Sequence, residues 1–214
     1  MRNLYLTIAL SLAAAAAPAA PPLHVEIAYE IARNDSPLAE VNQRLEHDGR
    51  SYRLSETWKG KGIYALRGEA VRSSQGAVVA DGLRPQKFED QRPGRETRHV
   101  EFDPASGTPT LLRQDQLSFM WSLAFSPPRD LVIAGVADGK RVTSYTYKVS
   151  GRERLQTPVG EFDALKLVKR KENPLDKATE VWLAVDRQYL PVRILVVEKD
   201  GTRLDQVAVK ISVK

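Results

Sequence analysis

The residue types that most often do chemistry in proteins are few and widely spaced in this chain. Its three histidines, His24, His47 and His99, show neither the i, i+4 nor the His-x-His spacing that places two imidazoles on one metal ion. There is no cysteine, which excludes disulfide bonds, thiolate metal sites and cysteine nucleophiles. The sequence also contains no nucleophile-elbow, dinucleotide-binding, phosphate-loop or zinc-protease motif. We therefore expect no metal site, no cofactor and a function other than catalysis.

Carboxylates are the remaining candidates for catalysis, because two of them side by side can act as general acid and general base. The aspartates considered for such a pair are Asp103, Asp115, Asp163 and Asp186. Each of them also occupies a position where a turn or a helix cap favours aspartate. A structural role is the simpler interpretation. A hydrolase of the cell envelope that uses these carboxylates is the third of the three functions that we consider.

A single apolar helix is predicted for residues 115–125, within the segment QDQLSFMWSLAFSPPRD. Its apolar residues recur at helical spacing and cover most of its circumference, leaving only Ser118 and Ser122 as a narrow polar stripe. Asp115 is placed to cap the first turn by accepting backbone N–H groups, and the two prolines that follow end the helix. Such a helix must be mostly buried. It either fills the core or covers a cavity that holds a ligand.

If the helix covers a cavity, its side chains and those of neighbouring strands would contact the ligand. Met120 suits such a surface because a thioether adapts to partners of varied shape. Tryptophans could line the site as well, although buried aromatic residues are more often part of a core. The predicted ligand-binding residues are Leu117, Met120, Trp121, Tyr147 and Trp182.

The rest of the chain is predicted to form strands around this helix. Residues 24–32 place Val25, Ile27, Tyr29 and Ile31 at every second position, which is the period of a strand with one buried face. Turn signals separate roughly ten such strands, a pattern typical of all-β sandwiches and barrels. One-sided alternation favours antiparallel pairing. We predict a mainly β fold: a single curved antiparallel sheet, forming an open half-barrel or a barrel, with the short apolar helix packed on its concave face.

Several local features refine this prediction. The dipeptides Asp48-Gly49 and Asp200-Gly201 predict hairpins. Gly151 predicts a turn after the strand at 141–150, and residues 62–71 predict another strand. The dipeptide Leu190-Pro191 predicts the start of an edge strand or a bulged strand, where a missing N–H is tolerated.

The N-terminal residues have the pattern of an export signal. A short positive segment, residues 1–3, precedes an apolar segment, residues 4–17, that is too short to span a bilayer. Ala17-Pro18-Ala19 fits the small-x-small pattern of a cleavage site. We predict a signal peptide at 1–19, a single β-rich domain at 20–214, a periplasmic location and no transmembrane span after cleavage. The alternative is a retained membrane anchor.

The charge pattern argues against a nucleic-acid-binding protein. The net charge is +5 at pH 7, and both signs are interspersed along the chain. No cluster of lysine and arginine carries aromatic residues between its members, as a nucleic-acid groove would. A weak attraction to anionic lipid head groups stays open. The charged run at 168–177 is predicted to be an exposed hairpin tip, or else a loop that docks a partner.

Several sequence motifs occur together and in a particular order. They are SSQGAVVADGLRPQKFED, VEFDPASG, QDQLSFMWSLAF, DGKRVTSYTYKVSGRERLQTPVGEFDALKLVKR and EVWLAVDRQYLPVRILVVEKDG. In this arrangement the chain resembles the bacterial family named domain of unknown function 3108, over about residues 23–213. The resemblance implies an exported, envelope-associated, β-rich single domain without an established activity or catalytic residues. Its architecture is similar to the curved half-barrel of periplasmic lipoprotein-localisation carriers, an analogy of fold that does not license function.

Three functions follow from these observations. The first is a non-enzymatic binding module for an apolar or lipid-like ligand, or for a hydrophobic segment of an envelope protein. The second is a structural or scaffold protein of the cell envelope that acts through protein–protein contacts, with the helix as a plug. The third is the envelope hydrolase.

Overall fold

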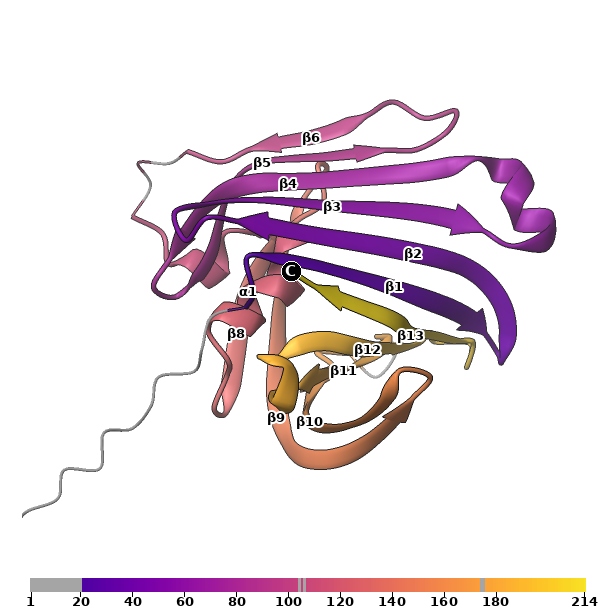
Figure 1. Ribbon diagram of the computed structural model, residues 1–214. Helices are drawn as coiled ribbons and strands as arrows, with labels where there is room; N and C mark the ends of the chain where they lie inside the picture. The colour runs from indigo at the N-terminus through magenta and orange to yellow at the C-terminus, as the bar shows by residue number, and fades with distance from the viewer. Residues whose placement is uncertain (1–20, 104, 106, 174–175) are drawn as a thin grey trace, which may run out of the picture.

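The fold is a single sheet of strands that curves around one short helix (Figure 1). A computed structural model of the chain describes residues 21–214 except 104, 106 and 174–175. The predicted signal peptide therefore lies outside the described residues. The strands are β1 (His24–Arg33), β2 (Ser36–His47), β3 (Ser51–Gly60), β4 (Glu69–Val79), β5 (Gly82–Gln91), β6 (Arg98–Glu101), β7 (Gln114–Asp115), β8 (Leu131–Ala137), β9 (Val142–Thr157), β10 (Gly160–Lys169), β11 (Ala178–Ala184), β12 (Leu190–Val197) and β13 (Arg203–Val213).

Helical turns are short in the described residues. The α-helix is α1 (Ser118–Phe125), and the 3-10 turns are η1 (Gly62–Arg67), η2 (Thr110–Leu112) and η3 (Val185–Arg187). No helix in the described part of the chain is both long enough and apolar enough to cross a bilayer.

The strand order runs β6-β5-β4-β3-β2-β1-β13-β12-β11-β10-β9-β8-β7. Neighbouring strands are antiparallel, except that β7 pairs with β8 in parallel. β6 and β7 are the two edges, and they do not pair with each other, so the sheet is curved but open. This confirms the predicted mainly β fold and decides between its two forms in favour of the open one.

The concave face is mostly apolar, because the alternate side chains that point to it from each strand are mainly apolar. In β1 the side chains of Val25, Ile27, Tyr29 and Ile31 are buried, while Glu26 on the other face is exposed, as the sequence predicts. The Tyr29 hydroxyl donates a hydrogen bond of 2.6 Å to the Pro191 carbonyl on β12, across the concave face.

α1 is buried on nearly all sides and contributes side chains to two apolar clusters. Leu117 and Trp121 belong to the cluster on the concave face, which includes side chains of β1–β3, β5 and β9–β13. Phe119 and Leu123 belong to a second cluster with side chains of β8–β11. A helix that packs on both sides is a plug in the core at this end of the sheet.

Asp115 caps α1 as predicted, although the helix begins three residues later than expected. Its Oδ1 accepts hydrogen bonds of 2.8 Å from the backbone N–H groups of Leu117 and Ser118. The expected start was residue 115, but Gln114 and Asp115 pair with β8 instead. The two serines are also buried: Ser118 Oγ donates to Gln114 Oε1, and Ser122 Oγ accepts from the Leu83 N–H.

Both predicted hairpins are confirmed, and Gly49 and Gly201 have the positive φ values, 82° and 83°, that these turns require. The strand that opens with Leu190-Pro191 is bulged, since the β11–β12 register shifts opposite that segment. Three other local predictions are wrong. Gly151 lies within the continuous strand β9 and allows its bend, with φ of 131°, instead of ending it. Residues 62–67 form η1, so β4 begins only at Glu69. The estimate of ten strands falls short of the thirteen in the described residues.

Candidate functional site

The five residues predicted to bind ligand are distributed between the two apolar clusters, both of which include side chains of α1. Leu117, Trp121 and Trp182 lie in the cluster on the concave face. Tyr147 lies in the second cluster. Met120 of α1 is partly buried and packs against this cluster. All but Met120 are almost fully buried by protein atoms. Their role in binding a ligand stays a prediction.

A row of polar side chains crosses the concave face next to α1. We call Gln43, Glu56, Arg72, Asp90 and Arg92 the inner polar row. The first four lie directly opposite one another on β2, β3, β4 and β5. Cross-strand neighbours on one face of a sheet are close enough to bond, so the register of the four strands alone builds this row.

Hydrogen bonds connect the row to α1 and along its length. Trp121 Nε1 donates to Gln43 Oε1 at 2.8 Å, and Gln43 Nε2 donates to Glu56 Oε2 at 2.7 Å. Arg72 Nη1 donates to Glu56 Oε1 at 2.8 Å. Arg92 Nη2 donates to Asp90 Oδ2 at 2.7 Å. The row therefore carries two carboxylates and two guanidinium groups in alternation, which compensates the charges buried in the sheet.

The two arginines of the row favour the ionised form of the Asp90 carboxyl. Its side chain is buried, which by itself raises the pKa, but hydrogen bonds from Arg92 and the charge of Arg72 outweigh burial and hold the pKa of Asp90 below its ordinary value. The Arg72 Nε lies 3.4 Å from Asp90 Oδ1 but lacks hydrogen-bond geometry. Among the described residues, this buried N–H therefore interacts through charge alone.

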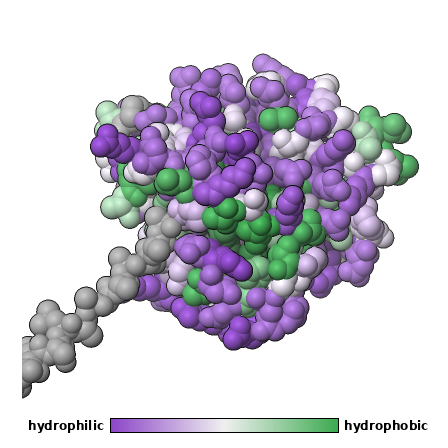
Figure 2. All heavy atoms as spheres, in the orientation of Figure 1, coloured by the Kyte–Doolittle hydropathy of each residue, from purple (hydrophilic) through white to green (hydrophobic). Residues whose placement is uncertain are grey.

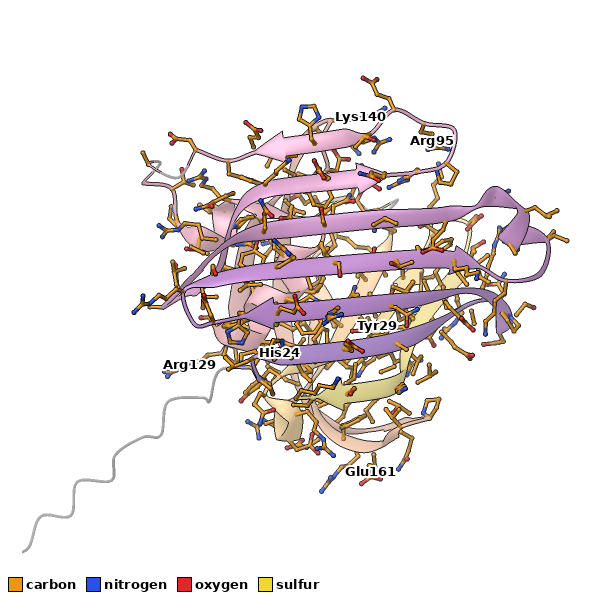
Figure 3. All side chains as sticks on the ribbon, turned by 45° about the horizontal axis from the view of Figure 1, so that its top comes forward. His24, Tyr29, Arg95, Arg129, Lys140 and Glu161 are labelled. Carbon is orange, nitrogen blue, oxygen red and sulfur yellow. The ribbon has the colours of Figure 1, made fainter. Side chains whose placement is uncertain are left out.

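Beyond the row, at the end of the concave face away from α1, the curved sheet borders an open cavity of about 560 Å³. Figure 3 shows the two ends of the molecule: His24 marks the end with α1, and Arg95 lies near the end with the cavity. The lining residues include Leu38, Trp58, Tyr64, Ala70, Pro93 and Leu204 as apolar or aromatic groups, and Arg33, Arg67, Arg72, Arg92 and Arg95 as cationic groups.

The charges around the cavity are unevenly distributed. Arg67, Arg72, Arg92 and Arg95 come from η1, β4 and the β5–β6 turn, whereas Glu198 and Asp200 come from the opposite β12–β13 turn. Arg72 and Arg92 are ion-paired within the row. Arg67 and Arg95 form no ion pair with any residue that the structure describes. These two cations at the rim are available to an anionic group.

The wall next to Arg67 depends on a tight backbone contact. Gly60 ends β3 and lets η1 fold back over the strand, because a Cβ at this position would clash with the carbonyl oxygen of Tyr64. η1 then presents Tyr64 to the cavity, and the Arg67 guanidinium lies 5.3 Å from the centre of the Tyr64 ring. Such a cation–π contact helps to fix the position of Arg67.

Volume alone does not identify the site. A hollow of about 620 Å³ lies beside Leu131 and Lys148, but both of these lining residues are exposed. The cavity beyond the inner polar row differs because it lies within the curve of the sheet and combines half-buried apolar groups, such as Leu38, Trp58 and Leu204, with cations at its rim. It is therefore the candidate binding site.

The aspartates considered for catalysis have local partners. Asp103 Oδ1 accepts the Ala105 N–H, and Asp163 lies 3.5 Å from Arg152 Nη1. Asp186 lies in the first turn of η3. Asp115 is buried, which raises its pKa, while hydrogen bonds from Ser74, Ser118 and Leu117 offset part of this effect. No hydrogen bond joins two of these four aspartates in the described part of the chain.

The histidines lie on separate strands, β1, β2 and β6, as the sequence predicts. His47 is buried, where its Nε2 lies 3.0 Å from the Pro21 carbonyl oxygen and its ring packs edge-on to Phe125. No group of three or more His, Asp or Glu side chains that could hold a metal ion occurs in the described residues.

The inner polar row and the cavity were missed from the sequence, although a signal for the row exists. In β3 the inward positions read Tyr52, Leu54, Glu56 and Trp58, so that a carboxylate interrupts an apolar series. Gln43 interrupts the corresponding series of β2. A polar residue at an inward position of each of two adjacent strands indicates a cross-strand pair inside the sheet.

Comparison with solved structures supports the fold. A β-barrel-like protein of domain of unknown function 1849 from Brucella abortus is 10% identical, with a TM-score of 0.51, covering 91% of this chain and 99% of that one. A candidate lipoprotein from Parabacteroides distasonis is 9% identical, with a TM-score of 0.40 and coverage of 90% and 97%. A candidate exported protein with a YmcC-like fold from Bacteroides fragilis is 9% identical, with a TM-score of 0.41 and coverage of 90% and 98%. At these identities the likeness to the Brucella protein concerns the fold alone.

Sequence comparison identifies the family. The chain matches no curated protein. The family model described as protein of unknown function (DUF3108) matches residues 28–207, which include β2–β12, α1 and most of β1, together with all cavity-lining residues. The resemblance stated from the sequence motifs is thereby confirmed, and the chain belongs to the domain of unknown function 3108 family.

Proposed function

We propose that this protein is an exported, non-enzymatic binding module that holds an amphipathic, lipid-like ligand with an anionic head group. The observation that carries the proposal is the cavity of about 560 Å³ with an aromatic and aliphatic wall and arginines at its rim. Its volume lies in the range of about 300–1,000 Å³ that is common for small-molecule sites. Export is supported by the leader-like sequence of residues 1–19.

The composition of the wall indicates how such a ligand would lie. Leu38, Trp58 and Leu204 offer apolar surface for a hydrocarbon chain. Arg67 and Arg95 would bind the head group, because guanidinium groups form short, charge-assisted hydrogen bonds with phosphate and carboxylate oxygens. The acidic side chains of Glu198 and Asp200 disfavour an anion at the opposite wall, so the ligand would have one preferred orientation.

The plug formed by α1 supports this function without contacting the ligand. Trp121 bonds to Gln43, and Gln43 bonds to Glu56, which lines the cavity. The helix thus holds the inner polar row in place from behind. Of the two interpretations of the helix, this arrangement corresponds to the one in which the helix fills the core, since α1 contributes no residue to the cavity.

Binding of octyl phosphate and octyl glucoside, measured by titration calorimetry below their micelle concentrations, tests the proposal. These compounds share an alkyl chain and differ in head-group charge. We expect octyl phosphate to bind at least tenfold more tightly, since a charge-assisted hydrogen bond contributes about 1.5–3 kcal/mol. Equal affinity would contradict the anionic head group. Binding of neither compound by the folded protein would contradict ligand binding and favour the scaffold function.

A pair of matched variants locates the site. Ala70 lines the cavity opposite Trp58, so Ala70→Phe should fill the space and abolish binding of octyl phosphate. Ala77 lies on the same strand at an odd-numbered position, on the outer face, so Ala77→Phe should leave the affinity unchanged. Equal effects of the two changes would place the ligand elsewhere.

A further inference from the structure

The 3-10 turn η1 at the mouth of the cavity exposes two large apolar side chains. Leu66 is 90% and Ile63 is 77% exposed, the highest values for large apolar side chains in the part of the chain that the structure describes. In Figure 1, η1 forms the tip between β3 and β4 at the right-hand end. Figure 2 shows apolar side chains at this same place on the edge of the molecule.

The geometry of η1 gives it two different sides. A 3-10 helix has three residues per turn, so residues three apart lie one above the other. Ile63 and Leu66 therefore share one side, and Tyr64 and Arg67 share another. The Tyr64 and Arg67 pair lines the cavity, while the Ile63 and Leu66 pair projects into solvent. The apolar pair is thus not part of the wall that holds a ligand.

Exposure at this level means that the two side chains contribute little to folding, because hydrophobic stabilisation scales with the area removed from water. A single exposed apolar residue is ordinary, but two on one side of a projecting turn form a surface suited to burial against something else. Neither side chain belongs to either apolar cluster of the core.

The charges near the apolar pair indicate what that surface would meet. Arg67 and Arg95 at the rim form no ion pair within the described residues. Lys61, which precedes η1, forms ion pairs with Glu30 and Glu40 at 2.9 and 3.0 Å. Glu69 follows η1 as an exposed acid. Apolar side chains flanked by unpaired cations match a bilayer whose surface carries anionic head groups over an apolar interior.

We propose that η1 docks this protein on the surface of an anionic phospholipid bilayer, with Ile63 and Leu66 inserted at the acyl boundary and Arg67 and Arg95 among the lipid phosphates. This goes beyond the binding of a ligand in the cavity. It rests on the outer side of η1 and on the two rim arginines. In this orientation the mouth of the cavity faces the membrane.

Flotation with vesicles tests the proposal. The protein starting at Ala20 is used, because it contains every strand and α1 but not the apolar residues 4–17. Vesicles contain either phosphatidylcholine alone or phosphatidylcholine with phosphatidylglycerol at about 3:1. We expect binding to the anionic vesicles, weakening as salt is raised from about 0.05 to 0.5 M, and little binding to the neutral ones.

Matched variants identify the surface. Ile63→Ser with Leu66→Ser should reduce partitioning about tenfold or more, because the burial of two large apolar side chains is lost. Leu131→Ser with Ile133→Ser is the control, since these side chains are 52% and 50% exposed on β8. The control should partition like the unmodified protein. Arg67→Gln should reduce binding to anionic vesicles about fivefold.

Three outcomes would overturn the proposal: no binding to either vesicle, equal binding to both, or equal losses in the two serine variants. Self-association that depends on Ile63 and Leu66, seen by sedimentation without vesicles, would assign the surface to a second copy of the chain instead. Titration with octyl phosphate separates the two proposals. If soluble octyl phosphate binds and vesicles do not, the docking surface is wrong and the ligand-binding function stands.

Discussion

The same strands build both ends of the concave face, but one end is filled by side chains and the other holds a cavity. At the α1 end, Ser74 Oγ donates a hydrogen bond to Asp115 and also bonds to the Tyr52 hydroxyl, and the fully buried ring of Trp121 packs in the core. At the other end the sheet leaves a cavity lined by Trp58 and several arginines. The inner polar row lies between these regions.

This difference shows that a single strand can contribute side chains both to the core and to the wall of the candidate binding site. In β3 the inward residues near α1 are Tyr52 and Leu54, which are buried, whereas Trp58 near the mouth is only half-buried. The α1 end should therefore be sensitive in stability and insensitive in binding. The open end should show the reverse.

Removing the largest side chain from each end is the strongest test of this comparison. Trp121→Ala should lower the free energy of unfolding by about 3–5 kcal/mol, because it leaves a cavity and an unpaired Gln43. Trp58→Ala should lower it by no more than about 2 kcal/mol, because this ring is half-buried. Urea unfolding followed by circular dichroism measures both values.

Binding data complete that test. At a temperature where both variants are folded, octyl phosphate should bind Trp121→Ala nearly as well as the unmodified protein and Trp58→Ala at least tenfold more weakly. The opposite ranking would assign the ligand to the α1 end, as the residues predicted from the sequence imply.

The second test concerns the carboxylate that caps α1. Asp115→Ala should cost about 3 kcal/mol, since it leaves the Leu117 and Ser118 N–H groups and the Ser74 hydroxyl without their acceptor. Asp115→Asn keeps an acceptor for the N–H groups and should cost about 1 kcal/mol or less at pH 7. Thermal unfolding of the three proteins gives these values.

The pH dependence of the same carboxylate has a defined sign. Burial raises the pKa of Asp115 above its ordinary 3.8, so the folded protein binds this proton more tightly than the unfolded chain does. The contribution of Asp115 to the free energy of unfolding is fully present below pH 3.8. It is lost as the pH rises through the pKa that Asp115 has in the folded protein. Asp115→Asn should remove that loss, and an unchanged pH profile would show that Asp115 does not titrate as described.

The third test uses the inner polar row. Asp90→Asn should lower stability at pH 7 by about 2 kcal/mol, because Arg72 and Arg92 lose a buried anionic partner. The pKa of Asp90 is lowered, so its stabilisation is present above 3.8 and is lost as the pH falls through the folded value. The variant should therefore show a shallower loss of stability on acidification below pH 4 than the unmodified protein.

The smallest effect on stability is expected at the rim. Arg67→Gln should change the free energy of unfolding by less than about 0.5 kcal/mol, as is usual for an exposed side chain without an ion pair. It should nevertheless weaken octyl phosphate binding several-fold and leave octyl glucoside binding unchanged. A change of more than about 1 kcal/mol in stability would show that the rim is part of the structural framework.

Much of the fold was predictable because strand periodicity and turn chemistry are local. The alternation in β1 and the two Asp-Gly hairpins were identified from the sequence. The turn predicted at Gly151 and the strand predicted at residues 62–67 are wrong, because the conformation of both segments depends on partners that are distant in the sequence. Gly151 extends a strand that β10 continues to pair with, and η1 replaces a strand where Gly60 lets the chain fold back.

The site was less predictable for a similar reason. The unusual apolar composition of the helix predicts either a plug or a cover over a ligand, and the structure shows it as a plug. Glu56 and Arg72 are unremarkable in sequence, and only the register of β3 and β4 places them opposite each other. The position of a cavity depends on how far a curved sheet is filled, which no local pattern encodes.

The pairing of β1 with β13 has a consequence for the order in which the protein can fold. β13 comes last among the described strands, yet it lies between β1 and β12 in the middle of the sheet. The chain emerges with its N-terminus first, both at the ribosome and across a membrane. One hydrogen-bonding edge of β1 therefore stays unpaired until β13 has emerged. An unpaired strand edge invites aggregation, and long-range pairing is slow. Loss of β13 would therefore split the sheet in two instead of trimming its edge.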